Sequence, residues 1–223
     1  MLHPDMMKKK ASFALIGDLI GSRQVADRAG LHTRLHGVLA AVNERFAPVT
    51  PLRVTVGDEY QGVFPSLGTA LQATLVLRLA LLPEVDVRHG IGAGELGVLQ
   101  EEPRVEDGPA WWVARDAIVA VEEGESRGPS RTLRTSYAVA AGAVEGLDGV
   151  PDPALVNAAL VLRDQLVAGA SERSLSVLRG LLESETQREV AARLGISPSA
   201  VSQRVRADGL GAIVTAHELL GGL

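Results

Sequence analysis

The chain has 223 residues, no cysteine and a formal net charge of −5 at pH 7. A chain without cysteine has no disulfides, thiolate metal sites or cysteine nucleophiles, and it suits a reducing cytoplasm, where we expect this protein to act. The negative charge argues against a protein that coats nucleic acid without specificity, and three Phe, two Trp and two Tyr are too few for a base-stacking surface. The apolar run at residues 13–20 contains Asp18 and is too short to span a membrane.

The first part of the chain alternates strand-like and helix-like segments. Residues 12–17 form a continuous apolar run that predicts a buried strand, and the apolar spacing over residues 31–46 predicts a helix. Two strand-like runs, 52–56 and 61–64, flank the Gly-Asp-Glu-Tyr segment that begins at Gly57. This layout predicts a β-hairpin with an acidic pair at its tip.

The segments that follow first continue this alternation and then become entirely helical. The expected order is an apolar helix closed by Pro83 (67–82), a glycine-rich strand from Val85 on, a helix (109–122) and a strand (132–140). Gly90 and Gly92 in that strand predict either close packing or room for a ligand. Residues 142–153, rich in Gly, Pro and Asp, predict a linker. Five helices are then expected at residues 154–168, 172–183, 187–194, 198–207 and 210–220. We therefore expect an α+β protein with an α/β domain at 11–145 and an all-α domain at 154–223.

Residues 187–207 have the spacing of a helix-turn-helix. Ala191 is small enough for a close helix crossing, Gly195 suits left-handed geometry at the turn, and Ser197 before a proline is a good start for the second helix. The Thr-Gln-x-Glu opening at Thr186 also resembles the helix-turn-helix of region-four sigma factors.

The outer side chains of the second helix predict contacts to double-stranded DNA. Gln and Arg pair with base edges, while Ser and Arg reach phosphates. The expected contact residues are Ser199, Ser202, Gln203, Arg204 and Arg206. Acidic residues balance the arginines of this part of the chain, so nonspecific affinity should be modest. The alternative is a helical hairpin that only packs or dimerises.

Two acidic motifs in the first domain predict a divalent-metal site. Asp18 is expected at the end of the first strand and Asp58 at the tip of the hairpin. Mg²⁺ takes one or two carboxylates and completes its shell with water and phosphate oxygens, so this pair suits Mg²⁺ or Mn²⁺. Gly21, Ser22 and Arg23 would let backbone amides approach the phosphates of a nucleotide. Each motif alone also fits a turn residue or a helix cap.

The order of these motifs resembles the catalytic core of class III nucleotidyl cyclases and GGDEF proteins, which is a palm-like (ferredoxin-like) α/β sandwich. The resemblance implies that Asp18 and Asp58 are the two metal-binding aspartates and that residues 87–94 form the strand written Arg-x-Gly-Ile-x-x-Gly in cyclases. It also implies that residues 107–117 form a dimer-interface helix, where Arg115 would stabilise the transition state in a partner copy.

The sequence departs from the cyclase pattern at two places. Cyclases carry an asparagine four residues before that arginine, where this chain has Trp111, and the first glycine of the GGDEF signature is replaced by Val56. Trp111 and Trp112 in place of polar groups imply changed or lost chemistry, stacking on a nucleobase, or packing in a core or dimer interface.

Five motifs in order identify the chain as a member of the SatD family, a resemblance that implies no particular reaction. The motifs are Ile-Gly-Asp-Leu-Ile-Gly-Ser-Arg from Ile16, Gly-Asp-Glu-Tyr-Gln from Gly57, Arg-x-Gly-Ile-Gly-x-Gly-Glu from Arg88, Asp-Gly-Pro-Ala-x-x-x-Ala-Arg-Asp-Ala from Asp107, and the terminal helix-turn-helix.

These observations predict a DNA-binding transcriptional regulator whose cyclase-like domain binds a nucleotide or mediates homodimerisation. The alternative is a metal-dependent nucleotidyl cyclase or nucleotidyltransferase that acts on a nucleoside triphosphate. A third reading is a cyclase-like scaffold that has lost its chemistry and serves assembly alone.

Overall fold

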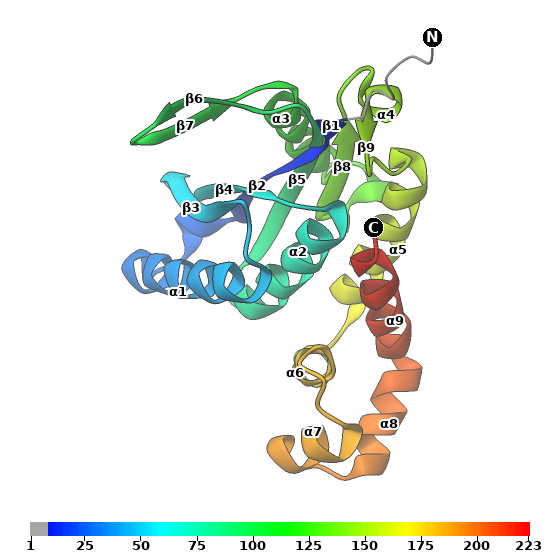
Figure 1. The fold of residues 1–223 in the computed structure, drawn as a ribbon. Helices are drawn as coiled ribbons and strands as arrows, with labels where there is room; N and C mark the ends of the chain where they lie inside the picture. Colours follow the sequence, from blue (N-terminus) through cyan, green and yellow to red (C-terminus); the bar gives the residue numbers. More distant parts are fainter. Residues whose placement is uncertain (1–8) are drawn as a thin grey trace.

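The protein has a mixed α/β part built on one sheet and a helical part that extends away from it (Figure 1). The structure is a computed structural model and describes residues 9–223. The central sheet has five strands in the order β3-β4-β2-β5-β8. β5 and β8 are parallel, and the other neighbouring strands are antiparallel. Within residues 9–223 no helix is both long and apolar enough to cross a membrane.

The elements of the α/β part lie close to the segments that periodicity predicts. The sheet strands are β2 (Ser12–Ile20), β3 (Thr50–Val56), β4 (Glu59–Phe64), β5 (Asp86–Gly94) and β8 (Thr135–Val139). The helices against the sheet are α1 (Arg28–Phe46), α2 (Leu67–Leu81) and α3 (Pro109–Gly124), and two short 3-10 turns are η1 (Ser22–Gln24) and η2 (Gly128–Ser130). Outside the sheet, β1 (Lys9–Lys10) pairs with β9 (Leu147–Asp148), while β6 (Gly97–Glu101) and β7 (Arg104–Asp107) form a projecting hairpin (Figure 1).

Alternate residues of β2 face two different layers of helices. Phe13 and Leu15 are buried in one hydrophobic cluster with residues of α1 and α2, whereas Ala14 and Ile16 are buried in another with residues of α3. Successive side chains of a strand point to opposite faces, so the sheet has a helical layer on each side. The same alternation carries Asp18 to the α3 face.

Glycines in β5 let α3 pack directly on the sheet. A Cβ atom added at Gly92 would lie 2.1 Å from the carbonyl oxygen of Ala110, and one at Gly90 would lie 2.2 Å from that of Ala114. Both obstacles are backbone atoms of α3, which cannot move unless the whole helix shifts. Close packing is therefore the reason for these alternating glycines, and no ligand is needed to explain them.

We predict that Gly92→Ala destabilises the protein by about 1–3 kcal/mol because it forces α3 off the sheet. Gly37→Ala is the matched control, since Gly37 lies inside α1 and an added Cβ meets no atom within 4 Å. Alanine there should stabilise the helix by about 0.5–1 kcal/mol. Urea unfolding of the two variants measures both effects. Equal stability of Gly92→Ala and the wild type would contradict this packing argument.

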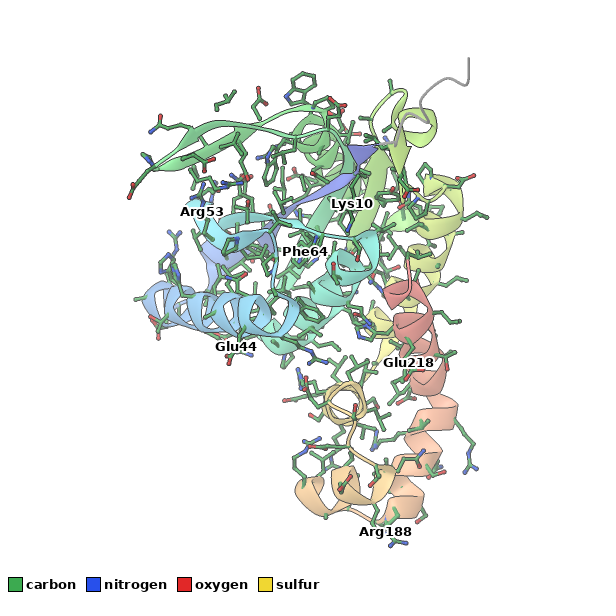
Figure 2. The ribbon with its side chains drawn as sticks, viewed as in Figure 1. Lys10, Glu44, Arg53, Phe64, Arg188 and Glu218 are labelled. Carbon is green, nitrogen blue, oxygen red and sulfur yellow. The ribbon has the colours of Figure 1, made fainter. Side chains whose placement is uncertain are left out.

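The helical part packs on α2 through a shared buried cluster. It contains α5 (Pro153–Gly169), α6 (Glu172–Leu182), α7 (Gln187–Leu194), α8 (Pro198–Ala207) and α9 (Leu210–Gly221). Leu75 and Leu79 of α2 belong to the same buried cluster as residues of α5 to α9. Figure 2 shows Arg188 of α7 at the end of the molecule far from the sheet, whereas Phe64, the last residue of β4, is buried in the interior.

Two expectations for the chain's organisation need correction. Residues 142–153 are not a plain linker, because they contain α4 (Ala143–Gly146) and β9, which pairs with β1. The first strand does not stop at Gly17 but continues to Ile20, paired throughout with β5. Asp18 therefore lies inside a strand rather than in the turn after it.

A buried charge cluster joins α5 to the sheet. Asp164 of α5 is fully buried, and its Oδ2 accepts the backbone N–H groups of Arg134 and Thr135 at 2.7 and 2.8 Å. Its Oδ1 lies 3.1 Å from Nη2 of Arg163 and 3.4 Å from Nη1 of Arg78. Asp86 of β5 neutralises the second positive charge, with its Oδ1 2.7 Å from Nε of Arg78. Each charge in the cluster thus has an opposite charge beside it.

Candidate active site

Asp18 forms a two-point ion pair with Arg88 on the α3 face of the sheet. The register of β2 and β5 places the two residues opposite each other. Nε of Arg88 donates to Oδ1 of Asp18 at 3.0 Å, and Nη2 donates to Oδ2 at 3.1 Å. Nη1 of Arg88 lies 3.0 Å from Glu122 and 3.8 Å from Glu125, at the C-terminal end of α3. Arg88 therefore has three carboxylates within reach.

An open pocket of about 360 Å³ lies beside this ion pair. It brings together all the residues for which the sequence predicts a metal or phosphate role, although they come from two separate segments. The lining residues are Asp18, Leu19, Gly21, Ser22, Arg23, Gln24, Asp58, Arg88 and Glu122. Leu19, Ser22 and Asp58 also line a narrow extension of about 40 Å³ that reaches α1.

The local sequence explains how the two acidic segments reach the pocket. Gly21 adopts left-handed geometry with φ 72°, which turns the chain out of β2 into η1, and an added Cβ there would meet no atom within 4 Å. Gly57 has φ 64° and with Asp58 forms the tight turn between β3 and β4. Glycine is favoured at positive φ. An added Cβ at either glycine would meet no atom within 4 Å, so both turns leave their backbone open to space.

The charges of the pocket act strongly on one another. Burial raises the pKa of Asp18 above its ordinary value; Asp58 and Glu122 raise it further, while Arg88 acts in the opposite direction. Burial alone would lower the pKa of Arg88, but the carboxylates around it, Asp18 first, raise it. Asp58 is thus close enough to Asp18 for their charges to repel, which is the arrangement that a shared cation would relieve.

The pocket residues fit a divalent cation only together with a phosphate ligand. No group of three His, Cys, Asp or Glu side chains within residues 9–223 could hold a metal ion by itself. Mg²⁺ commonly takes one or two carboxylates and completes its shell with water and phosphate oxygens. Asp18 and Asp58 can supply that share, although Arg88 holds both oxygens of Asp18 in this structure.

Arg115 and the two tryptophans of α3 lie outside the pocket lining. Arg115 binds Glu59 through two hydrogen bonds, the longer of 2.8 Å. Trp112 is 59% exposed and its Nε1 donates to Asp107 at 2.9 Å. Nε1 of Trp111 is buried and has no hydrogen-bond partner in the described part of the chain. Trp111 thus serves the packing of α3 on the sheet, where it contacts the buried cluster that includes Ala14 and Ile16.

A buried Tyr60–His89 pair lies in the sheet next to the pocket. The Tyr60 hydroxyl and Nε2 of His89 are 2.7 Å apart, and Tyr60 pairs with Gly17 across β4 and β2. Burial lowers the pKa of His89 to about 3, and the positive charges of Arg163 and Arg78 add to the effect. Burial also raises the pKa of Tyr60, as does the negative charge of Asp18. Both side chains are therefore neutral at pH 7.

We predict that this histidine makes the protein sensitive to acid. The pKa of His89 is about 3 in the folded chain, against 6.5 for an ordinary histidine. Between pH 7 and 5 only the unfolded chain takes up the proton, so stability falls as the pH falls, by about 2 kcal/mol from this group. Urea unfolding should show that His89→Gln loses less stability over this range than the wild type. The exposed His36→Gln control should keep the wild-type dependence, and equal slopes for all three proteins would count against the neutral buried imidazole.

Several important residues were not identified from the sequence. Arg88 occurs in a recognised motif, but nothing in the sequence showed that it would face Asp18. Glu59 belongs to the acidic pair predicted for the hairpin, but nothing in the sequence indicated that it would pair with Arg115. Glu122 gave no signal beyond being acidic. Their places depend on strand register and on the packing of α3, which are contacts between distant parts of the chain.

The residues predicted to contact DNA lie on α8. Ser199, Gln203 and Arg206 are exposed, whereas Ser202 and Arg204 are half-buried. Nη1 of Arg204 lies 3.4 and 3.3 Å from the hydroxyls of Ser171 and Ser174 at the start of α6, so this side chain faces the protein. Arg204 thus contacts the start of α6 while its side chain stays partly exposed, and its contact to DNA remains a prediction.

Solved structures similar to this chain are catalytic domains of adenylyl and guanylyl cyclases. A bacterial light-regulated adenylyl cyclase matches with a TM-score of 0.45 and 12% identity, over 57% of this chain and 43% of that one. The guanylyl cyclase domain of the RhoGC fusion protein from the aquatic fungus Blastocladiella emersonii matches with a TM-score of 0.40 and 15% identity, over 50% of this chain and 75% of that one. The chain thus covers less than half of the bacterial enzyme, and similarity at this level does not establish a shared activity.

The chain belongs to the SatD family, whose family model matches residues 12–219. No curated protein sequence matches it significantly. None of these comparisons assigns DNA binding to the C-terminal helices.

Proposed function

We propose that the pocket beside Asp18 binds a nucleotide together with a divalent cation. The observation that carries this proposal is the convergence of Asp18, Asp58 and the Gly21–Arg23 turn on one open pocket. Carboxylates hold the cation, Mg²⁺ or Mn²⁺, and the turn with Arg23 approaches the phosphates. A bound cation would offset charge on the phosphate oxygens during reaction.

In this proposal, Arg88 neutralises Asp18 when no cation is bound. A guanidinium neutralises the two oxygens of Asp18, and Glu122 and Glu125 offer it alternative partners 3.0 and 3.8 Å away. When a cation binds Asp18, Arg88 moves toward α3 and keeps its charge paired. The pocket thus avoids leaving a half-buried carboxylate without a partner.

The reaction proposed for the site is nucleotidyl cyclisation or transfer from a nucleoside triphosphate. A hydroxyl group of the substrate gives its proton to water, and its oxygen attacks the α-phosphorus. The bond from that phosphorus to the oxygen bridging it to the β-phosphate breaks, and pyrophosphate leaves. Arg115 would act in a homodimer, where it reaches the pocket of the second copy after releasing Glu59. Trp111 in place of an asparagine counts against efficient turnover. The proposal therefore rests first on binding of the nucleotide with its cation.

We expect Asp58→Asn to weaken Mg²⁺-dependent binding of a nucleoside triphosphate by at least about tenfold, which is 1.4 kcal/mol. Calorimetric titration with each ribonucleoside triphosphate, with and without Mg²⁺ or Mn²⁺, measures this effect. Asp116→Asn is the matched control, because Asp116 is exposed on α3 and does not line the pocket. Failure of every triphosphate to bind the wild type would refute the proposal. Release of pyrophosphate by the wild type but not by Asp58→Asn would establish enzyme activity.

We propose DNA binding by α7 and α8 as a second candidate function. A tight turn favours it: Gly195 has φ 64°, Thr186 and Glu189 form a capping box at the start of α7, and Ser197 caps α8. Ser199, Gln203 and Arg206 would contact the duplex from the exposed side of α8. Ser202 is half-buried beside them, and Arg204 would contribute after it leaves Ser171 and Ser174.

Arg206→Ala should weaken binding to duplex DNA. The slope of log K against the logarithm of the salt concentration should become shallower by about one, which corresponds to one lost phosphate contact. The measurement is a mobility-shift assay with duplexes selected from a random library by the wild-type protein. Arg131→Ala, which removes an exposed arginine of the α/β part, should bind as the wild type does. If no duplex is enriched, or if both variants bind equally, α8 is not a recognition helix.

A further inference from the structure

A groove separate from the Asp18 pocket runs between α1, α2 and α6. It consists of two adjoining cavities of about 550 and 240 Å³, which share Val76, Ala80 and Glu183 as lining residues. These sizes fall in the range of about 300–1,000 Å³ that is typical of small-molecule sites. None of the nucleotide-pocket residues lines either cavity.

The groove has an apolar floor and a positively charged rim. The floor residues come from three helices: Val38, Ala41, Val42, Val76, Leu79, Ala80 and Leu182. Arg34 and Arg45 stand on the α1 side of the rim, and Arg179 stands on the α6 side. A ligand for this site therefore has an apolar body and a polar end.

The charges of the rim do not cancel. Arg34 pairs with Glu84 and Arg45 pairs with Glu183. No described carboxylate lies within salt-bridge distance of Arg179, which instead donates to the backbone carbonyls of Leu79 and Leu82 at 2.7 Å each. Its Nη1 has only a 3.5 Å contact to the hydroxyl of Ser176.

The surroundings of Arg179 favour an anion. Burial lowers the pKa of Arg179, and the neighbouring charges of Arg34 and Arg193 lower it further, while Glu172 acts in the opposite direction. A carboxylate placed at Nη1 would relieve this repulsion and form a charge-assisted hydrogen bond. A second protein helix would bring backbone and side-chain volume that two cavities of this size do not accommodate.

We infer that this groove binds a small amphipathic carboxylate, with its straight apolar chain along the floor and its carboxylate on Arg179. The apolar chain gains the free energy of leaving water. The carboxylate pairs directly with Arg179, whereas Glu183, which also lines the groove, pairs with Arg45. The ligand bridges α1 and α2 of the α/β part to α6 of the helical part.

The test is calorimetric titration of the full chain with decanoate, and with decanol as the uncharged analogue. Decanoate should bind with one site per chain and decanol about tenfold more weakly or worse. Arg179→Gln should weaken decanoate binding about tenfold and leave decanol unchanged. Arg173→Gln is the matched control, because Arg173 is exposed on the same helix and lines neither cavity.

A second pair of variants keeps the test decisive if Arg179→Gln does not fold. Ala41→Trp places an indole in the groove and should abolish decanoate binding, whereas Ala40→Trp, on the exposed side of α1 and away from both cavities, should not affect it. Absence of decanoate binding to the wild type overturns the inference. Equal affinities for decanoate and decanol, or binding that survives Ala41→Trp, overturn it as well.

Discussion

Asp164 sets the geometry of this molecule, because one fully buried carboxylate meets groups from three elements. It receives two backbone N–H groups at the start of β8 and lies beside buried arginines of α2 and α5. Removing one partner of such a buried set leaves an uncompensated charge, which costs about 3–5 kcal/mol. The positions of α2, α5 and β8 are therefore mutually fixed. The position of α5 in turn determines where the helices that follow it begin.

The Asp18 pocket depends on the same sheet but uses charge differently. Asp164 is fully buried and accepts two backbone N–H groups, whereas Arg88 at the pocket has more carboxylates within reach than it can neutralise. A fixed pair maintains a fold, and a pair with alternatives can rearrange at low cost. This contrast is the physical basis for placing ligand binding at Asp18 and structural support at Asp164.

Periodicity in the sequence predicts most elements well, and the bounds of α7 and α8 agree with prediction at both ends. The pairing of Asp18 with Arg88 could not be predicted, because it depends on the antiparallel register of strands that are far apart in the chain. The sequence of α2 does indicate that the helical part packs on it. α2 is buried on almost all sides, and a helix that is apolar all round needs neighbours on more than one face.

Both edges of the central sheet are closed to further strands. At β8, Asn157 of α5 accepts the N–H of Tyr137 at 2.9 Å and donates to its carbonyl at 2.8 Å, so a side chain stands where a neighbouring strand would pair. At β3, Pro51 lacks an N–H, and two register shifts distort the pairing with β4. The sheet therefore resists growth by strand addition, which protects the protein against edge-to-edge aggregation. Two copies that associate would therefore do so without extending the central sheet.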